Sequence, residues 1–157
     1  MPNETGRTKS EDPSAPVFSP AYHADIDRLV ALKVEVMRGE LERLGRFTPE
    51  RARDRFVAGF SPEETRLIEV DGQFAGCVTV HDRGDQIEIE HLYLPTEVQG
   101  AGLGGRVMAV LMLEAATVGK PIRLTVLNGS PANRFYRRLG FTETDRDAID
   151  IHYVWTA

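Results

Sequence analysis

The chain has 157 residues, of which 41% are hydrophobic and 27% charged, and its formal net charge is −5. This composition is ordinary for a globular protein, and the length suits one domain with a core of its own. The acidic balance argues against nucleic acid and against an anionic membrane surface as the main partner.

The sequence also lacks the usual signals for a membrane or an export pathway. No apolar run approaches the roughly 20 residues that a membrane-spanning helix needs, and no apolar segment typical of a secretory signal opens the chain. Cys77 is the single cysteine and has no internal partner for a disulfide. We therefore expect a cytoplasmic protein with neither a membrane nor nucleic acid as a partner.

The first residues differ in character from the rest. Residues 1–16 are polar, contain Gly, Ser and Pro, and show no hydrophobic period. Such a segment buries too little apolar surface to fold, so it is predicted to be a disordered extension. Residues 17–157 are predicted to form the folded domain, beginning with a short strand at residues 17–22.

Two helices are predicted next. Apolar residues recur with helical spacing from residue 24 to residue 44, with Gly39 as an expected break or kink. Thr48 followed by Pro49 is typical of the N-cap and first turn of a second helix. The connecting residues 37–47 mix cations with an aromatic ring. They are expected either at the mouth of a pocket or as a solvated helix end.

A β-hairpin follows. The dipeptide Asp71-Gly72 lies between the apolar runs 66–70 and 74–81, which is the strongest short hairpin signal in the chain. A second polar turn at residues 82–85 leads into a further strand. These strands are therefore expected to pair antiparallel.

The strand that begins at residue 86 changes its pattern halfway. Ile87 and Ile89 alternate with polar residues, which predicts one buried face. The alternation fails at Leu92, Tyr93 and Leu94, which are apolar in succession. The strand there is either buried on both faces or carries a β-bulge that re-aims side chains and frees backbone groups.

A glycine-rich turn and an apolar helix follow this strand. The turn consists of Gln99, Gly100, Ala101, Gly102, Leu103, Gly104 and Gly105. Without Cβ atoms a ligand can approach the backbone closely, and the first turn of the helix offers unpaired N–H groups at its positive end. The pattern predicts a phosphate cradle. The alternative is a tight turn in which glycine only lets helix and strand pack closely.

The remaining elements complete the sheet. Residues 122–127 are a β-branched strand, and the helical crossover makes it parallel to the strand before the glycines. Ser130 is expected to cap a short helix with Pro131 in its first turn, which stops at Gly140. The alternating residues 149–155 predict a last strand.

Two segments together resemble a known family. Gln99-Gly100-Ala101-Gly102-Leu103-Gly104 has the form Gln/Arg-x-x-Gly-x-Gly/Ala of the acetyl-CoA motif in GNAT N-acetyltransferases, and it stands between a strand and a helix as it does there. The segment from Asn133 to Phe141 resembles the second hallmark of that family, a short helix that ends in a Tyr-x-x-x-Gly-Phe pattern. The resemblance covers residues 17–155.

The resemblance implies both a fold and a reaction. The fold is mixed α/β (α+β), with a central, mostly antiparallel sheet flanked by helices, in which two parallel strands splay apart. The reaction is transfer of an acetyl group from acetyl-CoA, as co-substrate, to a primary amine by direct attack in a ternary complex. The acceptor is a small-molecule or peptide amine that the sequence does not name, although the net negative charge favours a cationic one.

The resemblance also assigns residues to the co-substrate. The backbone of Leu92, Tyr93 and Leu94 would bind the pantetheine arm and polarise the thioester carbonyl, and the glycine-rich turn from Gln99 to Gly105 would bind the pyrophosphate. Many family members carry Lys or Arg where this chain has Ala101, so the cradle depends on backbone donors and Arg106. The family's pantetheine-binding Asn falls on Ser130, with Asn128 or Asn133 expected to supply the rest of the contact.

Three residues are candidates for the chemistry. An attacking amine must lose a proton, and a carboxylate near the thioester can take it. Glu90 and Glu88 lie on the polar strand face just before the irregularity, with Glu90 favoured; the alternative is a solvated sheet face. Tyr136 matches the family position whose hydroxyl protonates the departing CoA thiolate, and its alternative is a packed tyrosine.

Other ionisable residues receive lesser roles. His91 is expected on the strand face opposite Glu90, as a base or as a packed histidine. The remaining histidines show no ligand spacing, so no metal is predicted. Cys77 lies among Val78 and Val80 and is expected in the core rather than in a covalent acetyl relay.

Two other readings of the sequence stay open. Gly100, Gly102 and Gly105 spell the dinucleotide fingerprint G-x-G-x-x-G, but the next strand ends in Leu127-Asn128 without the acidic residue that would hold a ribose. A second alternative is a non-catalytic sensor or interaction module that binds acyl-CoA. The fold also allows a homodimer through the final strand or the first helices, with Trp155 as a contact.

Overall fold

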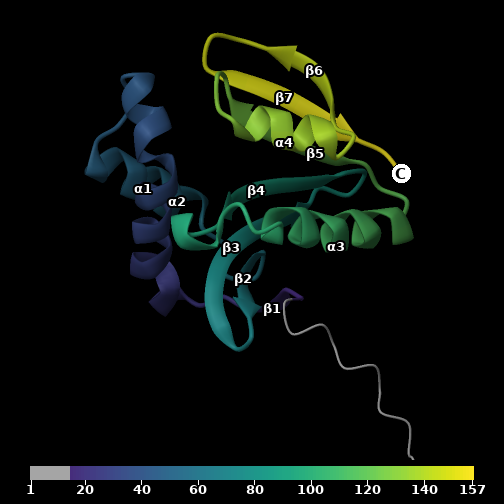
Figure 1. The fold of residues 1–157 in the computed structure, drawn as a ribbon, viewed down its shortest axis with the longest axis horizontal. Coiled ribbons are helices and arrows are strands. Elements are labelled where there is room, and N and C mark those ends of the chain that lie inside the picture. Colours follow the sequence, from purple (N-terminus) through teal and green to yellow (C-terminus); the bar gives the residue numbers. More distant parts are fainter. Residues whose placement is uncertain (1–14) are drawn as a thin grey trace, which may run out of the picture.

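A computed structural model describes residues 15–157, and their strands form one seven-stranded sheet in the order β1-β2-β3-β4-β5-β7-β6 (Figure 1). All neighbouring strands are antiparallel except β4 and β5. The predicted mixed fold is confirmed. The disordered extension predicted for residues 1–16 lies, up to residue 14, outside the described residues. The strands are β1 (Val17–Pro20), β2 (Thr65–Val70), β3 (Gln73–Asp82), β4 (Ile87–Tyr93), β5 (Ile122–Leu127), β6 (Thr142–Arg146) and β7 (Asp150–Trp155).

Four α-helices and two short 3-10 turns connect the strands. They are η1 (His23–Asp25), α1 (Ile26–Arg43), α2 (Pro49–Gly59), η2 (Thr96–Val98), α3 (Leu103–Thr117) and α4 (Ala132–Arg138). None of the helices within residues 15–157 is long and apolar enough to cross a bilayer. The predicted start of α2 is confirmed, because the Thr48 hydroxyl accepts a hydrogen bond from the Arg51 N–H at 3.1 Å.

Helix α1 runs through Gly39, so the predicted break at that residue is wrong. A glycine inside a helix costs only about 1 kcal/mol relative to alanine. Leu29 and Leu32 before it and Leu41 after it are all buried. The packing of this apolar stripe on both sides of Gly39 outweighs the cost and keeps the helix continuous.

The sheet separates two hydrophobic clusters. Neighbouring residues on a strand point to opposite faces, and Leu67 belongs to one cluster while Ile68 belongs to the other. Helices α1 and α2 cover the face of Leu67, whereas α3 and α4 cover the face of Ile68 (Figure 1). We call these the α1/α2 face and the α3/α4 face.

Strands β4 and β5 pair only at their beginning. The register joins Ile87 to Ile122 and Glu88 to Arg123, and no further pair follows. The crossover through α3 makes the two strands parallel, as predicted. Beyond Glu88 the facing backbone edges are free of each other, so the sheet opens between two central strands.

A β-bulge interrupts β4 where the alternation of its sequence fails. Thr79 on β3 is opposite Glu90, but Cys77 is opposite Tyr93, so β4 holds one extra residue in this interval. His91 has φ +52°, the left-handed conformation that accommodates such an insertion. The strand beyond is also buried on both faces, because Leu92 packs on the α3/α4 face and Tyr93 on the α1/α2 face.

The bulge corrects one prediction. Its extra residue places His91 on the same face as Glu90 rather than on the opposite one: His91 packs against Phe56 of α2 with ring centroids 5.2 Å apart. Two consecutive residues that share a face are the direct consequence of a two-against-one pairing.

Strand β6 (Thr142–Arg146) was not predicted. Its residues are polar and mostly exposed, so they show no alternation that a sequence pattern could reveal. It forms the edge of the sheet beside β7. Because β7 lies between β5 and β6, a dimer that extends the sheet at this side would have to pair through β6 and not through the final strand. The predicted homodimer itself stays a prediction.

Candidate active site

A cavity of about 480 Å³ lies at the opening between β4 and β5. Its walls come from α1 and α2 on one face of the sheet, from both splayed strands, and from α4 on the other face. The cavity therefore passes through the sheet. Its lining includes Glu88, Glu90, His91, Leu92 and Tyr93 of β4, Leu124 to Leu127 of β5, Ser130, Ala132 and Tyr136 near α4, and Lys33, Met37, Leu41, Arg46, Arg51, Ala52 and Arg55 of the helix pair and its connecting loop.

An acid–histidine chain lies on the α1/α2 face. The Nδ1 of buried His81 is 2.8 Å from the Glu64 carboxylate, and its Nε2 is 3.1 Å from the Glu90 carboxylate. Both partners are partly exposed, so the chain connects the cavity wall to the surface. Since an ionised carboxylate only accepts hydrogen bonds, the Nδ1 of His81 donates to Glu64.

Glu88 and Glu90 share this wall and influence each other. Partial burial first, and then the neighbouring Glu88, raise the pKa of Glu90 above its ordinary value, and His81 opposes this rise. For Glu88, burial acts to raise the pKa, but the hydrogen bonds from Glu90 and Arg83 outweigh it, so its pKa is lowered. Arg83 donates to Glu88 at 3.2 Å. The pair thus holds a proton preferentially on Glu90.

His91 and Tyr93 also belong to this wall of the cavity. The Tyr93 hydroxyl and Nδ1 of His91 form a hydrogen bond of 2.9 Å. Burial above all, and next the Lys33 charge, lower the pKa of His91 to about 4. His91 is therefore an uncharged, packed histidine, which was one of its two predicted roles.

Tyr136 enters the cavity from the α3/α4 face. Its ring packs edge-on against Phe135 and Phe141, with centroids 5.0 and 5.6 Å away. Burial raises the pKa of its hydroxyl, which therefore stays protonated at neutral pH. Tyr136 is packed and also lines the cavity. Its role as an acid for the CoA thiolate stays a prediction.

The glycine-rich turn forms an open N-terminus for α3. Gly100 and Gly102 have φ of +84° and +82°, and Gly102 is the N-cap of the helix. Among residues 15–157, no N–H from Gly100 to Gly105 donates to a backbone carbonyl. Arg106 follows in the first turn, and its buried Nε has no hydrogen-bond partner in the described part of the chain. These donors suit a phosphate group.

The glycines of this turn occupy their positions for different structural reasons. A Cβ on Gly104 would lie 3.3 Å from the Phe135 ring, so this glycine lets α3 pack closely on α4. A Cβ on Gly100, Gly102 or Gly105 would meet no atom within 4 Å. Close packing therefore explains Gly104 alone, whereas the other three leave backbone exposed to an approaching group.

The structure brings only some of the predicted site residues together. Those that line the cavity are Glu88, Glu90, Leu92, Tyr93, Ser130 and Tyr136. The turn residues Gln99, Gly100, Ala101, Gly102, Leu103, Gly104 and Gly105 lie outside it, at the start of α3; the Gln99 side chain donates to the Leu94 carbonyl at 2.8 Å, and Leu103 is buried in the core. That bond occupies the Leu94 carbonyl, a group expected to be free.

Asn133 is placed differently from its prediction as a contact to the co-substrate. Its side-chain amide donates to the carbonyls of Leu127 and Ser130, each at 2.9 Å, and accepts from the Tyr153 hydroxyl at 2.7 Å. The residue is 93% buried and does not line the cavity. Asn133 therefore joins β5, β7 and α4. The N-cap of α4 is Pro131 and not the predicted Ser130, whose hydroxyl accepts a 3.2 Å bond from the Ala132 N–H just before the helix.

Sequence reasoning missed two groups of residues. Glu64 lies in the turn before β2 and His81 on β3, whereas Glu90 is on β4, and no local motif links the three. The ligand atoms of His81, Glu88 and Glu90 lie within 4.8 Å of one another, a grouping that sequence spacing did not reveal. The absence of a metal stays a prediction. The second missed group is cationic: Lys33, Arg46, Arg51 and Arg55. Its only sequence signal was the cation-containing segment 37–47.

Cys77 is confirmed as a core residue. It is fully buried, and its thiol donates to the His91 carbonyl at 3.4 Å. Burial raises the pKa of the thiol to about 12, so a thiolate does not form near neutral pH.

Solved structures with the same fold include known acetyltransferases. PaiA N-acetyltransferase from Thermoplasma acidophilum, solved in complex with coenzyme A, has a TM-score of 0.72 at 16% identity, over 91% of this chain and 99% of that one. The ribosomal-protein-S18-alanine N-acetyltransferase from Escherichia coli has a TM-score of 0.69 at 16% identity, over 90% of this chain and 93% of that one. N-acetylglutamate synthase from Neisseria gonorrhoeae, complexed with coenzyme A and L-arginine, has a TM-score of 0.64 at 18% identity, over 91% of this chain but 33% of that one.

Identities this low establish the fold alone. A comparison with curated proteins gave no significant match. The sequence profile of the acetyltransferase (GNAT) domain, however, matches residues 61–143, which is just over half of the chain and includes β4, the glycine-rich turn and α4. The family suggested by the two sequence motifs is thereby confirmed: this chain belongs to the GNAT acetyltransferase family.

Proposed function

We propose that the chain is an N-acetyltransferase that uses acetyl-CoA and transfers the acetyl group to a primary amine by direct attack. The observation that supports this most is the cavity that passes through the sheet. It has carboxylates on the α1/α2 face and a tyrosine hydroxyl on the α3/α4 face. Two reactants that enter from opposite faces would meet at the opening between β4 and β5.

The α3/α4 face suits coenzyme A. The free N–H groups of Gly100 to Gly105 and the unpaired Nε of Arg106 would hold the pyrophosphate. The edges of β4 and β5 beyond Glu88 offer unpaired backbone groups to the pantetheine arm, because the strands no longer pair there. Acetyl-CoA would supply the activated acyl group as a thioester.

Glu90 is the proposed base. An ammonium has no free electron pair, so an amine must be neutral to attack a carbonyl carbon. Glu90 lies on the face from which an acceptor would enter, and its raised pKa makes it a better proton acceptor than an ordinary carboxylate. His81 and Glu64 continue from Glu90 to the surface, a path by which the proton can leave. Glu88, whose carboxylate accepts a hydrogen bond from Arg83, adds a second negative charge to this wall of the cavity.

Tyr136 is the proposed acid. When the tetrahedral centre collapses, the carbon–sulfur bond breaks and the electron pair leaves on the sulfur. A hydroxyl that stays protonated at neutral pH can give its proton to that thiolate. Tyr136 lies on the α3/α4 face, where the thiol would leave, and the side chains that line the cavity on this face are apolar apart from Tyr136 and Ser130.

The proposal is tested by binding and turnover together. Thermal unfolding should shift upward by several degrees with acetyl-CoA and CoA, and not with NAD, because a ligand at one hundred times its Kd stabilises a fold by about 2.7 kcal/mol. Thiol release with a panel of amines should follow. No shift with CoA would refute the proposal. A shift without turnover on any amine, unchanged when Glu88 and Glu90 are both replaced by alanine, would favour the non-catalytic acyl-CoA sensor.

A further inference from the structure

The wall of the cavity opposite Glu90 is cationic. Lys33 of α1, Arg46 of the connecting loop, and Arg51 and Arg55 of α2 all line it. The chain as a whole carries a net charge of −5, so this local excess of cations is opposite in sign to the protein. These four side chains line the cavity on its α1/α2 side.

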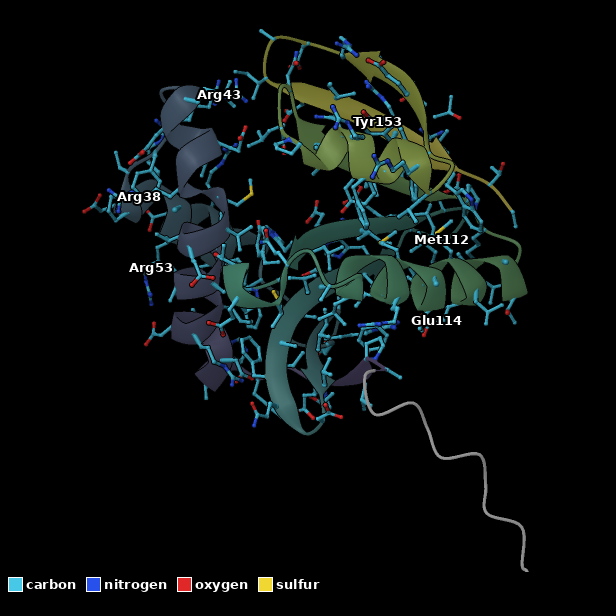
Figure 2. The ribbon with its side chains drawn as sticks, viewed as in Figure 1. Arg38, Arg43, Arg53, Met112, Glu114 and Tyr153 are labelled. Carbon is cyan, nitrogen blue, oxygen red and sulfur yellow. The ribbon has the colours of Figure 1, made fainter. Side chains whose placement is uncertain are left out.

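The three arginines of this wall differ from the other arginines of the helix pair. Arg28, Arg38, Arg43 and Arg53 each form an ion pair with a carboxylate at 2.7–2.9 Å. Arg38 and Arg53 lie on the outer side of the helices (Figure 2). Arg46, Arg51 and Arg55 form no ion pair and donate no side-chain hydrogen bond to any of residues 15–157. The unpaired guanidinium groups are thus the ones that face the cavity.

Two of these cations, Lys33 and Arg55, are close enough to repel each other. Lys33 is buried, and its ammonium donates to the Ala52 carbonyl at 3.2 Å. Burial first, and then the charge of Arg55, lower its pKa. Like charges gathered without partners raise the energy of the free protein, and a bound anion would relieve that repulsion.

Two further acidic residues lie near this cationic wall, but its four cationic side chains outnumber them. Asp150 lines the same cavity. Hydrogen bonds from the N–H groups of Asp150 and Ile149 lower the pKa of exposed Asp147 most, and the charge of Arg46 adds a smaller contribution. Asp147, just before β7, and Asp150, its first residue, also line a second cavity of about 340 Å³, which shares Arg46 and Arg55 with the first. Arg46 and Arg55 therefore stand between two adjoining cavities, where a group longer than the amine itself can extend.

From this arrangement we infer that the acceptor is a small amine that also carries carboxylate groups, with its amine at Glu90 and a carboxylate on Arg46, Arg51 and Arg55. Guanidinium groups bind carboxylates with two parallel hydrogen bonds, so they orient the acceptor as well as attract it. This class of substrate reverses the expectation of a cationic acceptor drawn from the net charge. The inference rests on the proposed acetyl transfer for the position of the amine.

The test compares two probes that differ only in charge. L-Glutamate carries an amine and two carboxylates, and L-glutaminamide has the same carbon chain and amine but no carboxylate. Calorimetric titration of the free and the CoA-saturated protein should show glutamate binding at least about tenfold more tightly than glutaminamide, with a preference that weakens as salt is added. L-Aspartate and glycine extend the acid series, and putrescine represents a cationic acceptor.

Arginine variants test which side chains bind the carboxylate. Arg51→Gln and Arg55→Gln should each weaken glutamate binding about tenfold, with unchanged affinity for CoA and for glutaminamide. Arg53→Gln is the matched control, because Arg53 lies on the same helix but pairs outward with Asp27 at 2.8 Å. It should leave every affinity unchanged.

Failure of the inference is distinguishable from failure of the proposed function. Putrescine or glutaminamide binding as tightly as glutamate, or none of the three amino acids binding, would overturn the inference even if CoA binds and neutral amines are acetylated. Loss of CoA binding would overturn the proposed function instead. In that case the titration of the CoA-free protein would still measure whether glutamate binds.

Discussion

The Nε2 of His81 lies 3.1 Å from the carboxylate of Glu90, although the two residues come from different strands and the imidazole is buried. The pairing ties the favoured candidate base to a second carboxylate, Glu64, on the other side of the same ring. A proton that arrives on Glu90 has a hydrogen-bonded route away from the cavity. Replacement of Glu90 or of Glu64 is therefore expected to interrupt this proton route.

Glu90→Gln should reduce kcat by about 10²–10⁴-fold, because the amide cannot accept the proton of the attacking amine. Glu88→Gln should have a smaller effect. Stopped-time thiol assays at saturating acetyl-CoA measure both. Equal losses for the two variants would instead show that neither carboxylate acts alone as the base.

The pH dependence of kcat/KM provides a separate check on Glu90. Activity needs its ionised form, which exists above its pKa, so the rate should rise with pH through an acid limb. Because burial and Glu88 raise the pKa of Glu90 above the ordinary 4.5, the midpoint should lie above that value. Glu88→Gln removes the neighbouring charge and should move the midpoint down. A limb that does not move would assign it to another group.

Tyr136→Phe should lower kcat by about 10²-fold or more, by the usual contribution of a general acid, and should leave the stability nearly unchanged. Its hydroxyl has no hydrogen-bond partner among residues 15–157, so the fold loses no internal bond with it. The loss should be smaller for thioesters with a more acidic thiol, because such a leaving group needs less protonation. A uniform loss across leaving groups would argue for a packing role.

His91 should make the protein less stable in mild acid. Its pKa is about 4 in the fold and 6.5 when unfolded, so between these values the unfolded chain binds more protons. Stability is therefore present above about pH 6.5 and falls as the pH decreases towards 4, by at most about 3 kcal/mol. Denaturant unfolding at a series of pH values should show this slope. His91→Asn, which tolerates the positive φ, should flatten it; an unchanged slope would assign the effect to other groups.

Asn133→Ala should destabilise the fold by about 2–4 kcal/mol, because it removes two hydrogen bonds to part-buried carbonyls and leaves the buried Tyr153 hydroxyl without its partner. Tyr153→Phe removes only one of these bonds and should cost about 1 kcal/mol. Denaturant titration gives both values. Full stability of Asn133→Ala together with weakened CoA binding would restore the role that the sequence suggested.

Gly105→Ala separates ligand contact from folding. Gly105 lies in α3 with an ordinary helical φ, and a Cβ there meets no atom within 4 Å. The variant should be as stable as the parent or more stable by up to about 1 kcal/mol. Its affinity for CoA should nevertheless fall, since the new methyl group stands where phosphate would approach the backbone. Gly102→Ala is the contrasting variant, because its positive φ of 82° should also cost stability. Unchanged CoA affinity in Gly105→Ala would place the pyrophosphate elsewhere.

Much of the fold could be predicted because its signals are local. The Asp71-Gly72 hairpin, the cap at Thr48 and the glycines before α3 each involve residues within a few positions of one another. The edge strand β6 could not be predicted, because an exposed polar strand is defined by its partner β7 and not by its own pattern. The break expected at Gly39 was wrong for a related reason, since packing on the sheet overrides a local propensity.

The sequence by itself determined the family, the glycine-rich turn, the irregularity in β4 and three candidate catalytic residues, since each depends on spacing along one segment. Only the tertiary structure decided what surrounds them. It placed His91 beside Glu90 through the bulge, joined His81 and Glu64 to that carboxylate, withdrew Asn133 into the core and gathered Arg46, Arg51 and Arg55 on the opposite wall. The physical reason is that charge and hydrogen bonding act through space, between groups that the chain brings together only when its sheet is formed.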